Sequence, residues 1–341
     1  MTDSENKIIL RINSLLIGYR KGKEVRPLLH PLNICAERGE LIAVIGANGT
    51  GKSTLLKTIA GLLPPLGGEI LIDGRNLKEY TRGEIATKSG FVSTEQVKVD
   101  SMKVTDLIEL GRYPYTSWTG RLKEKDYEMI NCAVEKTGLK NMAQRFINEL
   151  SDGERQKAMI ARLIAQDTDI MIMDEPTAFL DIRHRYEIIH LLRTLSAEKN
   201  KTILFSTHDL PVVINECDRV WLIAGQNVFD GAPEDIVLKG LLNKLFSDED
   251  VVFNPYDANF GYKKEFRKEI NIYGNGFEKH WTEKAFNRAG FRCVSNKTDN
   301  EVTVAQDSEG LFWIYCDKNT RSLKLRSVYD LLKWINTLQL K

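Results

Sequence analysis

A chain of 341 residues, with 42% hydrophobic and 28% charged residues, has an ordinary globular composition and is long enough for about two domains. Its 48 Lys and Arg residues are balanced by 47 Asp and Glu residues, which leaves a formal net charge of +1. This balance argues against nucleic acid as a partner, because proteins that bind it usually carry a clear excess of positive charge.

The cysteines and the N-terminus indicate a cytoplasmic protein. The five cysteines are scattered, and no pair has the spacing of a metal site or of a disulfide framework. Residues 1–7 are polar, and no stretch approaches the about 18 apolar residues that cross a bilayer. Any membrane role would therefore come through a partner.

Residues 8–240 predict an α/β fold with a largely parallel sheet, because short apolar strands alternate with helical stretches. Buried strands are expected at residues 41–45, 170–173, 202–205 and 220–223. Helices are expected at residues 123–138, 154–165 and 184–198. Residues 97 to about 150 contain no convincing strand, so we expect a helical insert at about 97–166.

A charged, Pro-containing stretch without periodicity, residues 247–257, is predicted to be a linker between two domains. The first domain would cover residues 1–246. The second, residues 258–341, predicts a small α+β appendage of unknown role. Its expected elements are helices at 281–289 and 327–338 and strands at 302–305, 311–315 and 323–325.

The strand at 41–45 runs directly into Gly46-Ala-Asn-Gly-Thr-Gly-Lys-Ser53, and a helical stretch follows. This is the phosphate-loop pattern G-x-x-x-x-G-K-[ST] in its strand–loop–helix context. Backbone N–H groups of such a loop point at phosphate oxygens, Lys52 reaches the β- and γ-phosphates, and the Ser53 hydroxyl can ligate Mg²⁺. The predicted ligands of ATP are Gly46, Asn48, Gly49, Thr50, Gly51, Lys52, Ser53 and Thr54.

Two further strands end in candidate catalytic side chains. The strand at 170–173 leads into Asp174-Glu175-Pro176, and the strand at 202–205 leads to His208. Beside a phosphate loop, Asp174 is predicted to hold Mg²⁺, Glu175 to polarise the attacking water, and His208 to contact the γ-phosphate. Without that loop, the acids would be an ordinary polar strand end and the histidine a structural residue.

These motifs together resemble the ATP-binding cassette (ABC) ATPases over about residues 8–240. Leu150-Ser-Asp-Gly-Glu154 is similar to the family's signature, commonly LSGGQ, and also matches a helix N-cap box. The resemblance implies that Ser151, Gly153 and Glu154 close over ATP held by a second copy of the chain, in a head-to-tail dimer. Ala178-Phe-Leu-Asp181 resembles the D-loop that runs along this interface.

Two other positions follow from the resemblance. Tyr19, in Gly18-Tyr-Arg, matches the aromatic residue that stacks on adenine. The family also places a Gln, which contacts Mg²⁺ and the membrane partner, after the strand that contains Phe91. Here Gln96 fills that role with a two-residue shift, whereas an ungapped count falls on Thr94. We favour Gln96, because its amide oxygen can reach a metal ion.

The segment Leu110-Gly-Arg-Tyr-Pro-Tyr-Thr-Ser-Trp118 resembles importer ATPases for ferric siderophores, haem and cobalamin. The resemblance implies an ATPase on the inner face of the cell membrane that drives integral membrane permease subunits and, through them, a periplasmic or lipoprotein substrate-binding protein. Tyr113, Pro114, Tyr115 and Trp118 would receive the permease or, alternatively, pack the core of the insert. An exporter ATPase and a soluble, non-transport ABC ATPase remain the alternatives.

Overall fold

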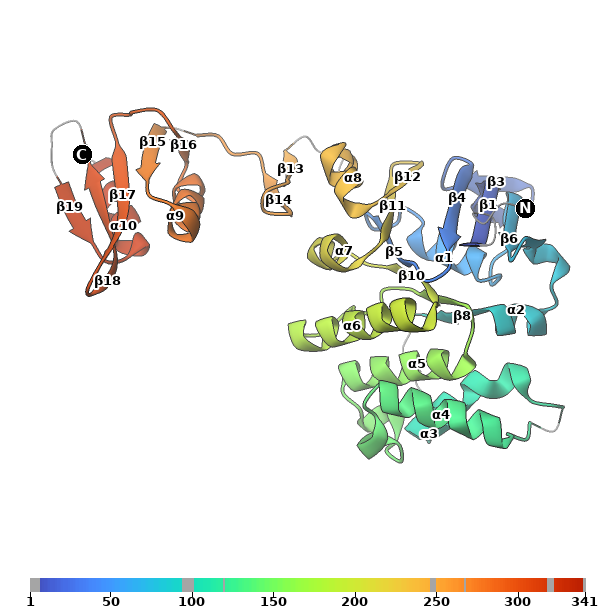
Figure 1. Cartoon of the computed structure of the whole chain (residues 1–341). Coiled ribbons are helices and arrows are strands. Elements are labelled where there is room, and N and C mark those ends of the chain that lie inside the picture. The colour runs from blue at the N-terminus through green and yellow to red at the C-terminus, as the bar shows by residue number, and fades with distance from the viewer. Residues whose placement is uncertain are drawn as a thin grey trace. The chain divides into compact units, whose positions relative to one another are not determined.

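The computed structural model describes residues 7–93, 101–118, 120–245, 250–266, 268–317 and 322–339, and the chain divides into two compact units, Met1–Gly261 and Tyr262–Lys341 (Figure 1). The two units are described separately. Within the described ranges, no helix combines the length and the apolar character needed to cross a membrane.

The first unit is built on a six-stranded sheet with the order β12-β11-β5-β10-β9-β8. Five strands are parallel, and β12 pairs antiparallel with β11. The strands are β5 (Leu41–Gly46), β8 (Ser89–Val92), β9 (Ile170–Met173), β10 (Thr202–Ser206), β11 (Arg219–Ala224) and β12 (Asn227–Gly231). The four strands expected from the sequence are confirmed, and their near-continuous apolar runs reflect burial on both faces of a parallel sheet.

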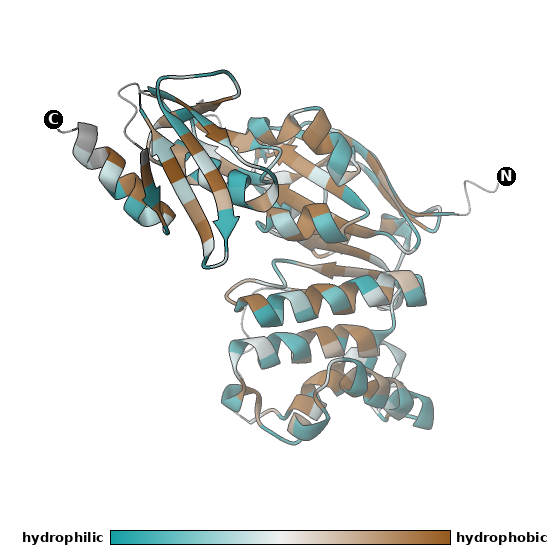
Figure 2. Ribbon diagram, turned by 60° about the vertical axis from the view of Figure 1, so that its left-hand side comes forward, coloured by the Kyte–Doolittle hydropathy of each residue, from teal (hydrophilic) through white to brown (hydrophobic). Residues whose placement is uncertain are grey.

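Alternate side chains of β5 enter two different cores. Leu41, Ala43 and Ile45 pack in one core with residues of helices α5 (Asp152–Gln166) and α6 (Ile182–Lys199). Ile42 and Val44 pack in the other core, with α1 (Lys52–Ile59) and a four-stranded antiparallel sheet. In Figure 2 the strands of the central sheet are largely in the hydrophobic colour, whereas the helices carry both colours. The phosphate-loop strand is therefore fixed by packing from both sides.

The sequence analysis did not resolve the smaller antiparallel elements. The four-stranded sheet has the order β4-β1-β6-β7, and β2 pairs with β3 in a separate hairpin. These strands are β1 (Ile8–Leu16), β2 (Gly18–Lys21), β3 (Glu24–Pro27), β4 (Leu32–Glu37), β6 (Gly67–Ile72) and β7 (Arg75–Asn76). The hairpin carries Tyr19.

The helices and 3-10 turns of the described residues between 101 and 166 are joined by turns and by one isolated bridge between Lys103 and Phe146. Their elements are α3 (Val104–Glu109), a 3-10 turn at Leu110–Tyr115, α4 (Glu124–Lys136) and α5. A buried ion pair joins them, in which Arg112 Nε donates to Asp126 Oδ1 at 2.9 Å. Arg112 Nη1 also donates to the carbonyl of Ala165 (2.8 Å), near the end of α5, and Asp126 Oδ2 accepts from the N–H of Lys123 (2.9 Å), which precedes α4.

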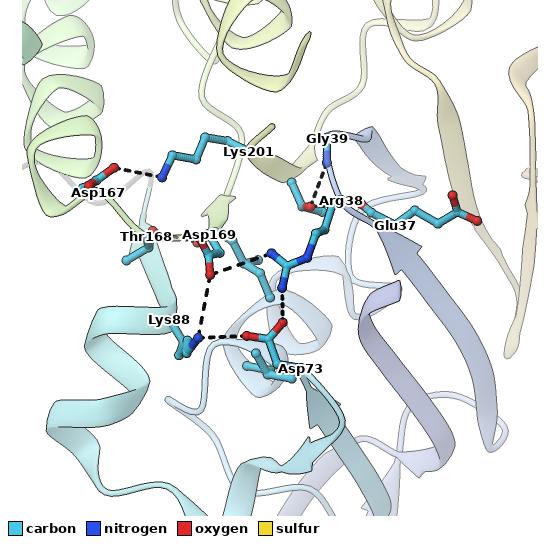
Figure 3. A network of polar contacts seen from close by, with 12 residues as sticks. Glu37, Arg38, Gly39, Asp73, Lys88, Asp167, Thr168, Asp169 and Lys201 are labelled. Carbon is cyan, nitrogen blue, oxygen red and sulfur yellow. Dashed lines mark hydrogen bonds and ion pairs between the residues drawn. The ribbon is translucent and has the colours of Figure 1, made fainter. Parts of the chain in front are cut away.

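A ring of four charges ties the antiparallel sheet to the central sheet (Figure 3). Asp73, between β6 and β7, pairs with Arg38 and with Lys88 (2.8 Å to Nζ), the last residue of α2 (Arg82–Lys88). Asp169, directly before β9, lies 3.9 Å from Arg38 Nη1 and 3.8 Å from Lys88 Nζ. The hydrogen bond to Asp73 raises the pKa of Lys88. This half-buried network fixes the start of the strand whose other end carries Asp174.

The expected linker at 247–257 is wrong in its described part, because residues 251–261 belong to the first unit. After α7 (Leu210–Glu216), α8 (Pro233–Leu238) and a 3-10 turn at Leu241–Leu245, strands β13 (Val251–Asn254) and β14 (Asn259–Tyr262) form a hairpin. Buried Phe253 packs it on the core of the first unit. Pro255 and Asp257 of the expected linker lie at the hairpin turn.

The second unit has its own sheet, with the order β16-β15-β17-β18-β19, and its own core around Phe286 and Trp313. Its elements are β15 (Lys268–Tyr273), α9 (Gly276–Arg288), β16 (Phe291–Val294), β17 (Glu301–Asp307), β18 (Gly310–Cys316), β19 (Ser322–Leu325) and α10 (Val328–Gln339). The expected α+β character is confirmed. The sequence analysis missed β15 and β16, which pair in parallel and begin the sheet.

Candidate active site

The loop after β5 requires glycine at several positions. Gly49 (φ +78°) and Gly51 (φ +104°) lie in the left-handed region that glycine tolerates best. A Cβ atom on Gly46 would come within 2.8 Å of Thr50 Oγ1 and 3.0 Å of the Ile223 carbonyl oxygen. The loop can therefore adopt this conformation without strain only because these side chains are absent.

Lys52 is the first residue of α1, and the loop wraps around its side chain. Its Nζ donates to the carbonyl oxygens of Gly46 (2.9 Å) and Ala47 (3.2 Å). Burial lowers the pKa of Lys52, and the nearby carboxylates of Glu175 and Asp174 oppose that shift. The ammonium group and the two acids thus act on one another electrostatically, as expected of parts of one site.

The acids are held by a residue that the sequence analysis missed. Ser206, at the end of β10, donates its hydroxyl hydrogen to Asp174 Oδ1 (2.7 Å) and accepts from the N–H of Glu175 (2.8 Å). These contacts hold Glu175 at φ +47°, a strained backbone conformation for this residue. The parallel register pairs Phe205 with Met173, so the strand alignment was the signal that could have placed Ser206 beside Asp174.

His208 completes this group at the carboxyl ends of the strands. Its Nε2 lies 3.0 Å from Glu175 Oε1. The structure therefore brings together the predicted residues Lys52, Asp174, Glu175 and His208 at one edge of the sheet, where ligands of open α/β folds bind.

Tyr19 and the Gln position have different outcomes. Tyr19 donates or accepts a hydrogen bond with Thr54 Oγ1 (3.0 Å), and 56% of the residue is exposed. Its ring thus lies beside the helix that follows the phosphate loop, where the adenine ring of a nucleotide can reach it. Thr94 and Gln96 lie outside the described residues.

The Ser151–Glu154 segment forms the predicted capping box at the start of α5. Ser151 Oγ accepts from the N–H of Glu154 (3.3 Å), and Glu154 Oε2 accepts from the N–H of Ser151 (2.9 Å). The second bond lowers the pKa of Glu154. Within the described part of the chain, Ser151 and Glu154 bond to each other rather than to the phosphate loop. Gly153 is buried, and a Cβ there would come within 3.0 Å of the His184 ring.

His184 is a further residue that the sequence analysis missed. Its N–H donates to Asp181 Oδ1 (2.9 Å), which caps α6, and its Nδ1 lies 2.9 Å from Asp181 Oδ2. Phe179, two residues before Asp181 in the expected D-loop, is 90% exposed at φ +62°. The signature helix and the D-loop are therefore packed together through His184, and an apolar side chain projects beside them.

A phosphate loop beside a strand-end acid pair defines a P-loop ATPase, and the comparisons with known proteins narrow the class further. A family model described as "ABC transporter" matches residues 29–178. A second, described as "Iron ABC transporter C-terminal domain", matches residues 267–336.

Curated relatives and solved structures agree with these matches. The petrobactin import ATP-binding protein FpuD of Bacillus anthracis is 35% identical over 250 residues, covering 71% of this chain and 92% of the relative. The ferric enterobactin transport ATP-binding protein FepC of Escherichia coli (strain K12) is 34% identical over 247 residues, covering 72% and 89%. The ABC transporter cassette MJ0796, solved as a dimer, has 25% identity and a TM-score of 0.59 over 66% of this chain and 99% of its own.

The chain belongs to the ATP-binding proteins of ABC transporters. It is an ATPase, and the predicted P-loop core is confirmed. Cassettes of this family form dimers, and one has been solved with ADP and phosphate. CbiO1 of Clostridium perfringens, 27% identical with a TM-score of 0.60 over 70% of this chain and 94% of its own, is part of the ABC transporter complex CbiONQ.

Proposed function

We propose that this chain powers the import of an iron chelate, with Lys52, Glu175 and His208 as its hydrolysis residues. The observation that carries the substrate class is the match of the second unit to an iron ABC transporter C-terminal domain, beside relatives named for petrobactin import and ferric enterobactin transport. ATP binding closes a head-to-tail dimer of two copies, and hydrolysis reopens it. Permease subunits convert this cycle into transport and receive the chelate from a periplasmic or lipoprotein binding protein.

In the proposed hydrolysis, each group of the site has its own role. The glycine-rich loop and Lys52 hold the β- and γ-phosphates, while Tyr19 stacks on the adenine. Glu175 takes a proton from the attacking water, and His208, 3.0 Å away, orients that carboxylate and contacts the γ-phosphate. Ser206 holds the backbone of Glu175 by accepting a hydrogen bond from its N–H.

The oxygen donors of the site suit Mg²⁺. The Asp174 carboxylate is buried, and among its described contacts only Oδ1 accepts a hydrogen bond, from Ser206. Ser53 adds a hydroxyl oxygen in the first turn of α1. Ser53 and Asp174 would hold the ion, directly or through water, with Gln96 as the further ligand. Bound Mg²⁺ neutralises charge on the phosphates.

Replacing Ser151 by Arg is expected to stop hydrolysis without much loss of ATP affinity in the isolated chain. The signature serves the nucleotide of the partner copy, so an added cation and side chain there blocks closure of the dimer. Loss of the helix cap also costs about 1 kcal/mol of stability. The measurements are ATP turnover, ATP affinity at low protein concentration and a melting curve. Asn141→Arg, at an exposed position of the insert, is the matched control, and an equal loss of monomer affinity would contradict the trans role.

The permease contact is proposed at Tyr113, Pro114 and Trp118. Tyr113 and Trp118 are exposed, and Tyr113 and Pro114 line a groove of about 580 Å³ between the insert, the end of α1, and α2. Tyr115 does not belong to this surface, because its hydroxyl donates to the carbonyl of Gln166 (2.9 Å) and its ring lies under the Arg112 guanidinium (4.0 Å).

Replacing Tyr113 by Ala is therefore expected to weaken assembly with the permease about tenfold, since aromatic anchors dominate such interfaces. Co-purification with permease subunits measures the effect. Tyr127→Ala, at an exposed position of α4, is the control. Equal recovery of permease by both variants would show that the groove is not the docking surface.

The direction of transport decides between the importer and an exporter. In proteoliposomes that hold the chain, its permease subunits and the binding protein, ATP is supplied on the side of this chain. Radioiron-labelled catecholate or hydroxamate chelates are expected to accumulate on that same side. The Glu175→Gln variant supplies the background. ATP-driven loss of the chelate from the side of this chain would establish an exporter instead.

A further inference from the structure

The β13–β14 hairpin is held on the first unit by two aromatic rings. Phe253 of β13 is 7% exposed in the core, and its N–H donates to Asn243 Oδ1 (2.8 Å). Phe260 of β14 meets Phe253 edge to face, with ring centroids 5.3 Å apart, and packs against the same core. The core of the ATPase unit therefore fixes the position of β14.

This attachment places the hairpin beside the hydrolysis residues. Asn259 and Phe260 line a cleft of about 470 Å³, and the same cleft is lined by Glu175 and His208. Phe179 of the D-loop also lines it. The hairpin thus forms one wall of a space whose other walls include the proposed general base Glu175, Phe179 of the D-loop, and the switch histidine His208, which together with Asp209 we call the switch segment.

Inside this cleft, Arg185 joins the D-loop to the switch segment. Its Nη1 pairs with Asp209 Oδ2 (2.6 Å), and its Nη2 donates to the carbonyl of Leu180 (3.3 Å). Asp209 follows His208 directly and caps α7 by accepting from the N–H of Val212. The Nε of Arg185 is buried and has no partner among the described residues. The Arg185 guanidinium thus links the D-loop, at Leu180, to the switch segment, at Asp209.

We propose that Phe260 is a positioning residue for ATP hydrolysis, which holds the D-loop and the switch segment in their catalytic arrangement from the far side of the cleft. Removing its ring opens that wall and frees Phe179 and Arg185 to shift. Displacements of about 1 Å can cost up to about 10²-fold in rate, so a distant packing residue is enough to control turnover. The inference rests on the assignment of Glu175 and His208 to hydrolysis.

The test compares full-length Phe260→Ala, Phe260→Leu and Tyr256→Ala chains in steady-state ATP hydrolysis. We expect Phe260→Ala to lower kcat about tenfold with KM unchanged. Phe260→Leu, which refills most of the space, should recover most of the rate. Tyr256, 95% exposed at the hairpin turn, is the matched control and should leave both parameters at the wild-type values. Melting curves measure any loss of folding separately.

The outcomes separate this inference from the assignment of the site. If Phe260→Ala keeps the wild-type kcat while Glu175→Gln does not hydrolyse ATP, the role of Phe260 is overturned and the assignment of Glu175 stands. A lower melting temperature with unchanged kcat in the folded protein also overturns it. Normal turnover by Glu175→Gln overturns both.

Discussion

Replacing Glu175 by Gln is expected to lower the rate of ATP hydrolysis by about 10²–10⁴-fold, because the amide cannot take a proton from the attacking water. The substitution keeps the shape of the side chain. The hydrogen bond from the backbone N–H of residue 175 to Ser206 and the bonds from Lys52 to the phosphate-loop carbonyl groups do not depend on the carboxylate. ATP should therefore still bind. The ATP-bound dimer should accumulate because hydrolysis, which reopens it, is blocked.

Steady-state turnover and size-exclusion chromatography with and without Mg-ATP measure the two effects. Glu198→Gln, an exposed glutamate near the end of α6, is the matched control. Lys52→Ala provides the contrast, since it removes a phosphate ligand and should lose nucleotide binding or turnover without trapping a dimer. Near-normal hydrolysis by Glu175→Gln would remove the general-base assignment.

Replacing Asp126 by Asn is expected to lower the free energy of unfolding by about 3–5 kcal/mol, because it leaves the Arg112 guanidinium buried without its counter-ion. The two side chains are only 5% and 6% exposed, so water cannot replace the lost carboxylate. Arg112 also contacts the end of α5 through Ala165, so the loss extends to the signature helix.

Denaturant or thermal unfolding measures this effect, with Asp167→Asn as the control. Asp167 pairs with Lys201 at 2.9 Å but is half exposed, and Asn tolerates its left-handed backbone, so about 1 kcal/mol or less is expected there. Equal stabilities of the two variants would show that the buried pair does not hold the insert together.

The same pair predicts a pH dependence. The N–H of Lys123 and then the Arg112 guanidinium hold the pKa of Asp126 below its ordinary value of 3.8. A carboxyl whose pKa is lowered on folding adds stability above its unfolded pKa of about 3.9, and that stability is lost as the pH falls through the folded value. The difference between the wild type and Asp126→Asn should therefore be full at neutral pH and shrink below about pH 4.

The sequence by itself determined the phosphate loop, the acid pair, the switch histidine and the capping box. Each lies within a few residues of a strand or helix end, so the element that positions it is visible in the same stretch of sequence. Ser151 and Glu154, three residues apart, could be paired in this way before any fold was known. The family resemblance then supplied the roles that local pattern could not.

Only the tertiary structure decided which distant groups support these residues. Ser206 reaches Asp174 because β9 and β10 pair in parallel, and Arg185 reaches Asp209 because α6 and α7 pack together. The hairpin at 251–262 looked like a linker because its turn is polar and its two anchoring rings are isolated in the sequence. Such contacts join side chains whose separation along the chain follows no period. They are fixed by strand register and core packing, which the sequence determines only through the whole fold.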